Sequence, residues 1–139
     1  MEISEATENY LETILILSQK KPELHAIDIC DELGYSRPTL SVVLKRMKKE
    51  GLIVVDENNH ITLTDEGRKI AEKIYERHNV ISKFFMDIGV EESVALRDAC
   101  KIEHDLSDET FRCIKNYIKK MGNTDDGEGT KDERSAFPR

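Results

Sequence analysis

The sequence contains no apolar run that approaches the roughly 18 residues needed to cross a bilayer. Its N-terminal stretch MEISEATENY has neither a basic segment nor an apolar core, so it does not have the pattern of a signal peptide. These absences predict a cytoplasmic protein with no membrane partner.

Cysteine is scarce, and the three present are Cys30, Cys100 and Cys113. An odd number of thiols in a reducing compartment disfavours a disulfide framework and favours metal binding or burial. Cys30 and Cys113 fall in apolar patterns, so we predict that both are packing residues.

Common catalytic signatures are also missing. The chain has no glycine-rich phosphate loop, no HExxH and no pair of Cys-x-x-Cys motifs. The alternative is an enzyme, either a zinc-type hydrolase with Glu103 as general base or one with a nucleophile pair of Cys100 and His104. We therefore predict no enzymatic activity and no small-molecule substrate.

The charge is uneven along the chain. The net charge of −7 argues against general binding to nucleic acid. Residues 36–51, however, hold five basic residues against one acid, whereas residues 1–14 hold four acids and no base. A single basic segment in an acidic protein indicates a small anionic contact, the alternative being a solvated helix face.

The first half of the chain has the pattern of a winged helix-turn-helix. Helical stripes over residues 6–18 and 25–33 are followed by a basic helix over 37–49, which Ser36 caps and Gly51 ends. The runs LIVV and HITLT then flank a turn rich in Asp and Asn, as in a β-hairpin. Such a fold places its third helix in the major groove of DNA.

The second half is predicted to be helical over residues 65–88, 91–104 and 110–121. The fold class is thus mainly α, a winged helix-turn-helix domain (residues 1–72) followed by a helical domain (73–121). Residues 122–139 are polar and glycine-rich, so we expect a disordered acidic tail.

The basic helix supplies the candidate DNA contacts. Residues at the start of a recognition helix reach base edges, and here they are Ser36, Arg37, Pro38, Thr39 and Ser41. Basic residues further along are expected to contact phosphates, namely Lys45 and Arg46 with Lys48 and Lys49. The alternative is a winged helix that binds a protein partner without any metal.

A candidate metal site lies in the stretch CKIEHDLS. Cys100, Glu103 and His104 occupy positions i, i+3 and i+4, which share one face of a helix. This mixed donor set suits first-row divalent metals such as Fe²⁺, Co²⁺, Ni²⁺ and Zn²⁺, and Mn²⁺ less well. Three ligands do not close a site, so we also consider His78, which interrupts an apolar helical stripe, and the pair Asn9 and Glu12.

From Thr7 to Met121 the chain resembles the DtxR/MntR family of metal-dependent transcriptional repressors. The segments that carry the resemblance are TENYLETI, DICDELGYSRPTLSVVLKRMKKEGLI, LTDEGRKIA, ERH and ACKIEHDLS. The resemblance implies a homodimer that binds a palindromic operator in double-stranded DNA, with a divalent metal as corepressor. It also implies that Asn9, Glu12, His78, Cys100, Glu103 and His104 form the metal site.

The family comparison divides the ligands between two branches. Cys100 matches the iron-sensing branch and Glu12 the manganese-sensing branch, whereas Asn9 matches neither. Ser82 and Leu96 occupy the positions of the ancillary site of iron sensors, so that site is expected to be absent. The chain also ends before the SH3-like domain of many iron sensors. The expected protein is thus the short form, with Fe²⁺ or Mn²⁺ as its metal.

Overall fold

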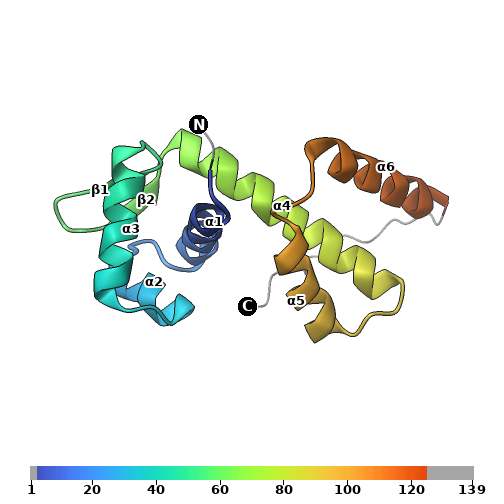
Figure 1. The fold of residues 1–139 in the computed structure, drawn as a ribbon, viewed down its shortest axis with the longest axis horizontal. Helices are drawn as coiled ribbons and strands as arrows, with labels where there is room; N and C mark the ends of the chain where they lie inside the picture. Colours follow the sequence, from blue (N-terminus) through green and yellow to red (C-terminus); the bar gives the residue numbers. More distant parts are fainter. Residues whose placement is uncertain (1–2, 125–139) are drawn as a thin grey trace. The chain divides into compact units, whose positions relative to one another are not determined.

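The computed structural model describes residues 3–124 of the 139. The chain divides into two compact units, Met1–Tyr75 and Glu76–Arg139, whose helices and strands are drawn in Figure 1. The division falls within one long helix, and each unit has its own apolar core. The predicted mainly α architecture is confirmed, with one two-stranded sheet in the described residues.

Three helices form the helical part of the first unit: α1 (Glu5–Lys20), α2 (Ala26–Leu33) and α3 (Arg37–Lys49). At the start of each helix, a side-chain oxygen accepts a hydrogen bond from a free backbone N–H. Ser4 Oγ accepts from the N–H of Thr7 at 3.1 Å, and Ser36 Oγ accepts from the N–H of Thr39 at 3.3 Å. At the start of α2, Asp28 accepts from the N–H of His25 at 2.8 Å.

A tight turn joins α2 to α3. Gly34 ends α2 in the left-handed conformation with φ 76°, which a residue without Cβ adopts at little cost. Two residues later Ser36 caps α3, as the sequence predicts. This turn sets the direction of α3, the predicted recognition helix.

The hairpin consists of β1 (Ile53–Val55) and β2 (Ile61–Leu63), paired antiparallel. In its turn Asn59 has φ 66°, and Asp56 Oδ1 accepts from the N–H groups of Asn58 and His60 at 2.8 and 2.9 Å. Helix α3 contacts β1 and α1 contacts β2. Together, the helices and the hairpin enclose the core of the first unit, whose most buried members are Leu11, Ile14, Leu24, Ile29, Leu40, Met47, Leu52, Ile53 and Ile61.

The long helix α4 (Asp65–Asp87) starts in the first unit and continues into the second. Its first turn approaches the hairpin closely at Gly67, where a Cβ would lie 2.1 Å from the carbonyl oxygen of Leu52. Thr64 spans the same junction, since its Oγ donates to the carbonyl of Gly51 at 2.7 Å and accepts from the N–H of Gly67 at 3.0 Å. Glycine is therefore required at position 67 by space.

In the second unit the rest of α4 is joined by α5 (Glu92–Ile102) and α6 (Asp108–Thr124). The buried core residues are Ile81, Ala99 and Phe111, with Val80, Phe85, Ile102 and Leu106 packed against them. No helix within residues 3–124 combines the length and apolarity required to span a bilayer.

The predicted helix over residues 91–104 extends two residues too far at its C-terminal end, because α5 ends at Ile102. The N–H of Glu103 still donates to Ala99, but that of Asp105 turns back to Ile102 at 3.0 Å. The carbonyl of Glu103, which the next helical turn would use, instead accepts from Arg77 at 2.9 Å. Glu103 and His104 thus lie in the turn that follows the helix.

Two further expectations about the last helix are wrong. Cys113 is exposed rather than packed, because Phe111 already faces the core and a residue two positions later points away from it. Helix α6 reaches Thr124, so residues 122–124 belong to a helix and not to a disordered tail. The remainder of the predicted tail, 125–139, lies outside the described residues.

Gly67→Ala is expected to destabilise the protein by about 1–3 kcal/mol, because the new methyl group overlaps the backbone of Leu52 and α4 must move off the hairpin. Urea denaturation followed by circular dichroism measures the change. Lys69→Ala, at an exposed position of the same helix, is the matched control and should change stability little. A Gly67→Ala protein as stable as wild type would contradict the close approach.

Candidate metal centre and DNA-binding face

Three side chains from separate parts of the second unit converge on one point. His78 comes from α4, Cys100 from α5 and Glu103 from the turn after α5. His78 Nδ1 lies 2.9 Å from Glu103 Oε1 and 3.7 Å from Cys100 Sγ. Within residues 3–124, His78, Cys100 and Glu103 form the group of potential metal ligands whose ligand atoms all lie within 4.8 Å of one another.

His104 lies beside this group. Its Nε2 is 3.5 Å from Glu103 Oε2, so the two oxygens of one carboxylate face two different imidazoles. The side chains of His78, Glu103 and His104 are at most 3% exposed, whereas Cys100 is exposed as a residue. Burial of a carboxylate is costly unless its charge is compensated, and a cation among these donors provides such compensation.

The donor set and its spacing fit a transition metal. A metal bound to sulfur at about 2.3 Å and to nitrogen at about 2.0–2.1 Å separates neighbouring ligand atoms by about 3–4 Å. The distances of 2.9 and 3.7 Å fall in or next to that range without any rearrangement. A thiolate, an imidazole and a carboxylate together suit iron, cobalt and zinc better than magnesium or calcium.

The other two predicted ligands, Asn9 and Glu12, lie on α1 in the first unit. Glu12 is buried, with 4% of its surface exposed, and Asn9 is exposed. Their spacing of three residues puts them on neighbouring positions of one helix face. Their membership of the metal site stays a prediction.

Ser82 has a backbone role. Its Oγ donates to the carbonyl of His78 at 2.7 Å, one helical turn earlier, and the residue is 4% exposed. This hydrogen bond joins Ser82 to the backbone of His78, whose imidazole is a candidate metal ligand. Leu96, the second position expected to lack an ancillary ligand, is partly buried on α5.

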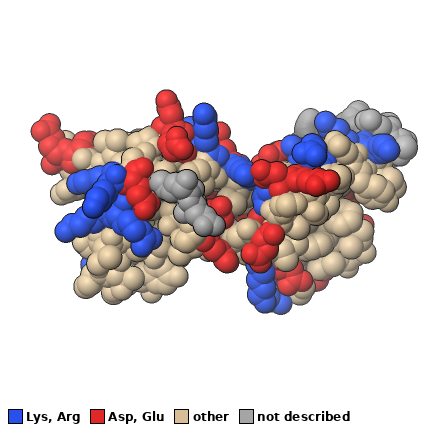
Figure 2. All heavy atoms as spheres, turned by 45° about the horizontal axis from the view of Figure 1, so that its top comes forward, with Lys and Arg blue, Asp and Glu red and all other residues tan. Residues whose placement is uncertain are grey.

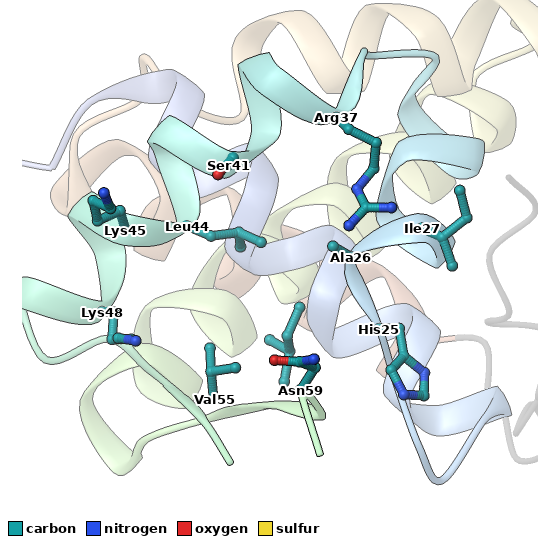
Figure 3. Close-up of a pocket in the computed structure, with 11 residues that line it drawn as sticks. His25, Ala26, Ile27, Arg37, Ser41, Leu44, Lys45, Lys48, Val55 and Asn59 are labelled. Carbon is teal, nitrogen blue, oxygen red and sulfur yellow. The ribbon is translucent and has the colours of Figure 1, made fainter. Parts of the chain in front are cut away.

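The predicted DNA contacts lie on the exposed surface of α3. Arg37, Ser41 and Lys45 follow one another at intervals of four residues and, with Lys48, line one side of a hollow of about 510 Å³. The start of α2 lines the opposite side, and the hairpin closes the lower edge (Figure 3). Leu44, Val55 and Ile61 supply apolar lining, so the hollow offers both positive charge and apolar surface.

The other predicted DNA contacts, Ser36, Pro38, Thr39 and Arg46, do not line the hollow. Ser36 and Thr39 form the cap of α3, where Ser36 Oγ donates to Thr39 Oγ1 at 2.9 Å. Pro38 is exposed in the first turn. Arg46 points to α1 and donates to Thr7 Oγ1 at 3.3 Å. Of the predicted DNA contacts, Arg37, Ser41 and Lys45 therefore lie on one face of α3, whereas Arg46 is directed toward α1.

Two polar residues that line the hollow, His25 and Asn59, are not among the DNA contacts predicted from the sequence. The Asp-Asn turn of the hairpin is the signal that marks Asn59. The pKa of Asp56 in that turn is lowered, mainly by the hydrogen bond from the N–H of His60. The hydrogen bond from the N–H of Asn58 and the nearby His60 ring lower it further. His25 gives no comparable signal, because its position depends on how α2 packs beside the hairpin, where its ring meets that of His60 at 4.7 Å.

Many of the basic side chains of the first unit lie together in one region of its surface. Figure 2 shows lysine and arginine side chains gathered over the region of α3, with acidic side chains beside them. The cluster corresponds to the basic segment of residues 36–51, in a chain with a net charge of −7. This cluster gives the region of α3 an electrostatic attraction for an anionic partner.

Comparison with known proteins agrees with a DNA-binding first part of the chain and a metal-binding second part. The family model for the iron dependent repressor N-terminal DNA binding domain matches residues 2–61, and that for the iron dependent repressor metal binding and dimerisation domain matches residues 64–129. The chain belongs to the iron-dependent repressor family. Members of this family are DNA-binding transcriptional regulators and not enzymes.

Individual relatives support this membership. The chain is 35% identical over 118 residues to the transcriptional regulator MntR of Escherichia coli, covering 85% of this chain and 76% of that protein. It is 30% identical over 121 residues to the diphtheria toxin repressor of Corynebacterium diphtheriae, covering 86% of this chain and 54% of the relative. The solved structure of the manganese regulator SloR, at 24% identity, has the same fold with a TM-score of 0.72, over 86% of this chain and 55% of that one.

Cobalt(II) absorption spectroscopy tests the thiol ligand. Titration of Co²⁺ into the reduced protein is expected to produce a thiolate-to-metal charge-transfer band, since Cys100 Sγ lies among the other donors. Cys100→Ala should remove the band, and Cys113→Ala should retain it, because Cys113 is exposed on α6 away from the cluster. An unchanged band in Cys100→Ala would show that another thiol binds the metal.

Proposed function

We propose that the protein is a metal-dependent transcriptional repressor of metal-ion homeostasis, in which a divalent transition metal acts as corepressor. The observation that carries this proposal is the cluster of His78, Cys100 and Glu103, whose ligand atoms lie within 4.8 Å in a chain that also has a winged helix. The alternative of a metal-independent interaction module leaves that cluster without a role.

The proposed metal site consists of Asn9, Glu12, His78, Cys100, Glu103 and His104. When bound, the metal supplies two positive charges to a group of acidic and neutral donors, of which the side chains of Glu12, His78, Glu103 and His104 are buried. In this proposal the ligands come from α1 as well as from α4, α5 and the turn after α5. Support comes from the spacing of Asn9 and Glu12 and from the burial of Glu12.

Fe²⁺ and Mn²⁺ are the proposed corepressors. The thiolate of Cys100 favours Fe²⁺, Co²⁺ or Zn²⁺ over Mn²⁺ on the basis of ligand softness. Relatives named as manganese regulators, such as SloR, have the same fold, and the matching family models are named for iron. Co²⁺, Ni²⁺ and Zn²⁺ also fit the donor set.

The switch is a free-energy coupling between the metal and the DNA. If both ligands favour the same arrangement of the two units, each raises the affinity for the other, with a coupling of about 1–3 kcal/mol in typical cases. Protons compete for the thiolate and the imidazoles, so metal affinity is expected to fall as the solution is acidified.

The proposed partner is a palindromic operator in double-stranded DNA, bound by a homodimer in the cytoplasm. A two-fold dimer presents two recognition helices to two half-sites. Arg37, Ser41 and Lys45 face the DNA, the first two near base edges and the third near phosphates. In the same proposal Pro38 and Thr39 contact thymine methyl groups. The DNA-binding domain is taken as residues 1–72 and the metal and dimerisation domain as 73–121.

Arg37→Ala is expected to weaken binding to a selected operator duplex by about 1–3 kcal/mol, because it removes a charged donor from the DNA-facing side of α3. Fluorescence anisotropy at saturating metal measures the loss, and the Co²⁺ affinity should not change. Lys20→Ala removes an equal charge at the end of α1 and serves as the control. Unchanged DNA affinity in Arg37→Ala would mean that the orientation of α3 is wrong.

A further inference from the structure

Arg77 is a buried cation beside the candidate metal centre. It precedes His78 on α4 and is 4% exposed, although its guanidinium is always charged. Burial of a charge is costly unless hydrogen bonds and an opposite charge compensate for it. The partners of this side chain therefore indicate what the burial achieves.

Arg77 donates hydrogen bonds to the short segment that joins α5 to α6 and to the first residue of α6. Nη1 donates to the carbonyl of Glu103 at 2.9 Å and to that of Leu106 at 2.6 Å. Nη2 donates to Asp108 Oδ1 at 2.7 Å. The guanidinium also lies 5.3 Å from the centre of the Phe111 ring, a cation–π distance. One side chain thus holds residues 103–108 against α4.

We propose that Arg77 is a positioning residue for the metal centre, which holds the segment of Glu103 and His104 in its binding geometry before the metal arrives. This inference rests on the proposed metal site. Arg77 holds the backbone of Glu103, while its neighbour His78 lies 2.9 Å from the side chain of the same residue. Two consecutive residues of α4 therefore fix one ligand at both ends.

The energetic reason is preorganisation. A turn after a helix has few backbone hydrogen bonds of its own, and ordering it on metal binding lowers the affinity. Arg77 meets this cost during folding, since its Nη1 donates to two carbonyls of the turn that follows α5. Groups outside the ligand set that orient ligands in this way typically change metal affinity by 10–100-fold.

The contacts of Arg77 are unequal. The carboxylate of Asp108 is 71% exposed, so its ion pair with Arg77 is screened and contributes little. The hydrogen bond to the carbonyl of Glu103 is buried. The two carbonyl contacts are therefore expected to carry most of the positioning, which gives the variants a definite order.

The test is competitive Co²⁺ titration of the full-length reduced protein, with the charge-transfer band reporting Cys100 and circular dichroism reporting folding. Arg77→Met is expected to weaken Co²⁺ binding by about 10–100-fold. Arg77→Lys, which keeps the charge but not the fork, should lose less, and Asp108→Asn should stay within about threefold of wild type. Glu76→Gln, which breaks the exposed pair with Lys115, is the matched control with wild-type affinity.

Each outcome decides a different question. Folded Arg77→Met and Arg77→Lys proteins that bind Co²⁺ as tightly as wild type would overturn the inference, even if their melting temperatures fell, because a purely structural role changes stability and not the affinity of the folded protein. If Arg77→Met does not fold, Arg77→Lys decides in the same way. If wild type itself binds no Co²⁺, the proposed metal site fails, and the proposed function fails with it.

Discussion

The second unit depends on the burial of one carboxylate. Glu103 is fully buried, and its two oxygens face His78 at 2.9 Å and His104 at 3.5 Å. An acid in that position needs nearby positive or hydrogen-bonding groups, and the groups around it, His78, Cys100 and His104, are of types that can also bind a metal. The same requirement explains why α5 ends at Ile102, since the turn lets Glu103 and His104 point inward together.

Much of the fold follows from the sequence. Ser36, Gly34 and Gly51 mark helix ends where the backbone needs a cap or a positive φ, and the structure places them there. The hairpin is found from its Asp-Asn turn. These features are local, so a short window of sequence determines them. The convergence of His78 with Cys100 and Glu103 agrees with the set that the family resemblance implies, in which His78 interrupts an apolar stripe and the other two lie three residues apart.

Other features depend on packing between distant residues. Nothing in the sequence around Arg77 indicates that its guanidinium reaches residues 26 to 31 positions away. The end of α5 was misplaced for that reason. Cys113 was expected to be buried from its apolar neighbours, but only the orientation of Phe111 decides which face of α6 is covered. Arg46 belongs by composition to the basic helix, yet it contacts α1.

The central claim is that metal binding controls DNA binding, and anaerobic fluorescence anisotropy tests it most directly. The reduced protein is titrated onto an operator duplex with Fe²⁺, with Mn²⁺, with Zn²⁺ and with a chelator. The account predicts tight binding only with metal, and the order of the metals then identifies the corepressor. Equal binding in the chelator would contradict it, and the cluster at Glu103 would be a structural feature of the second unit.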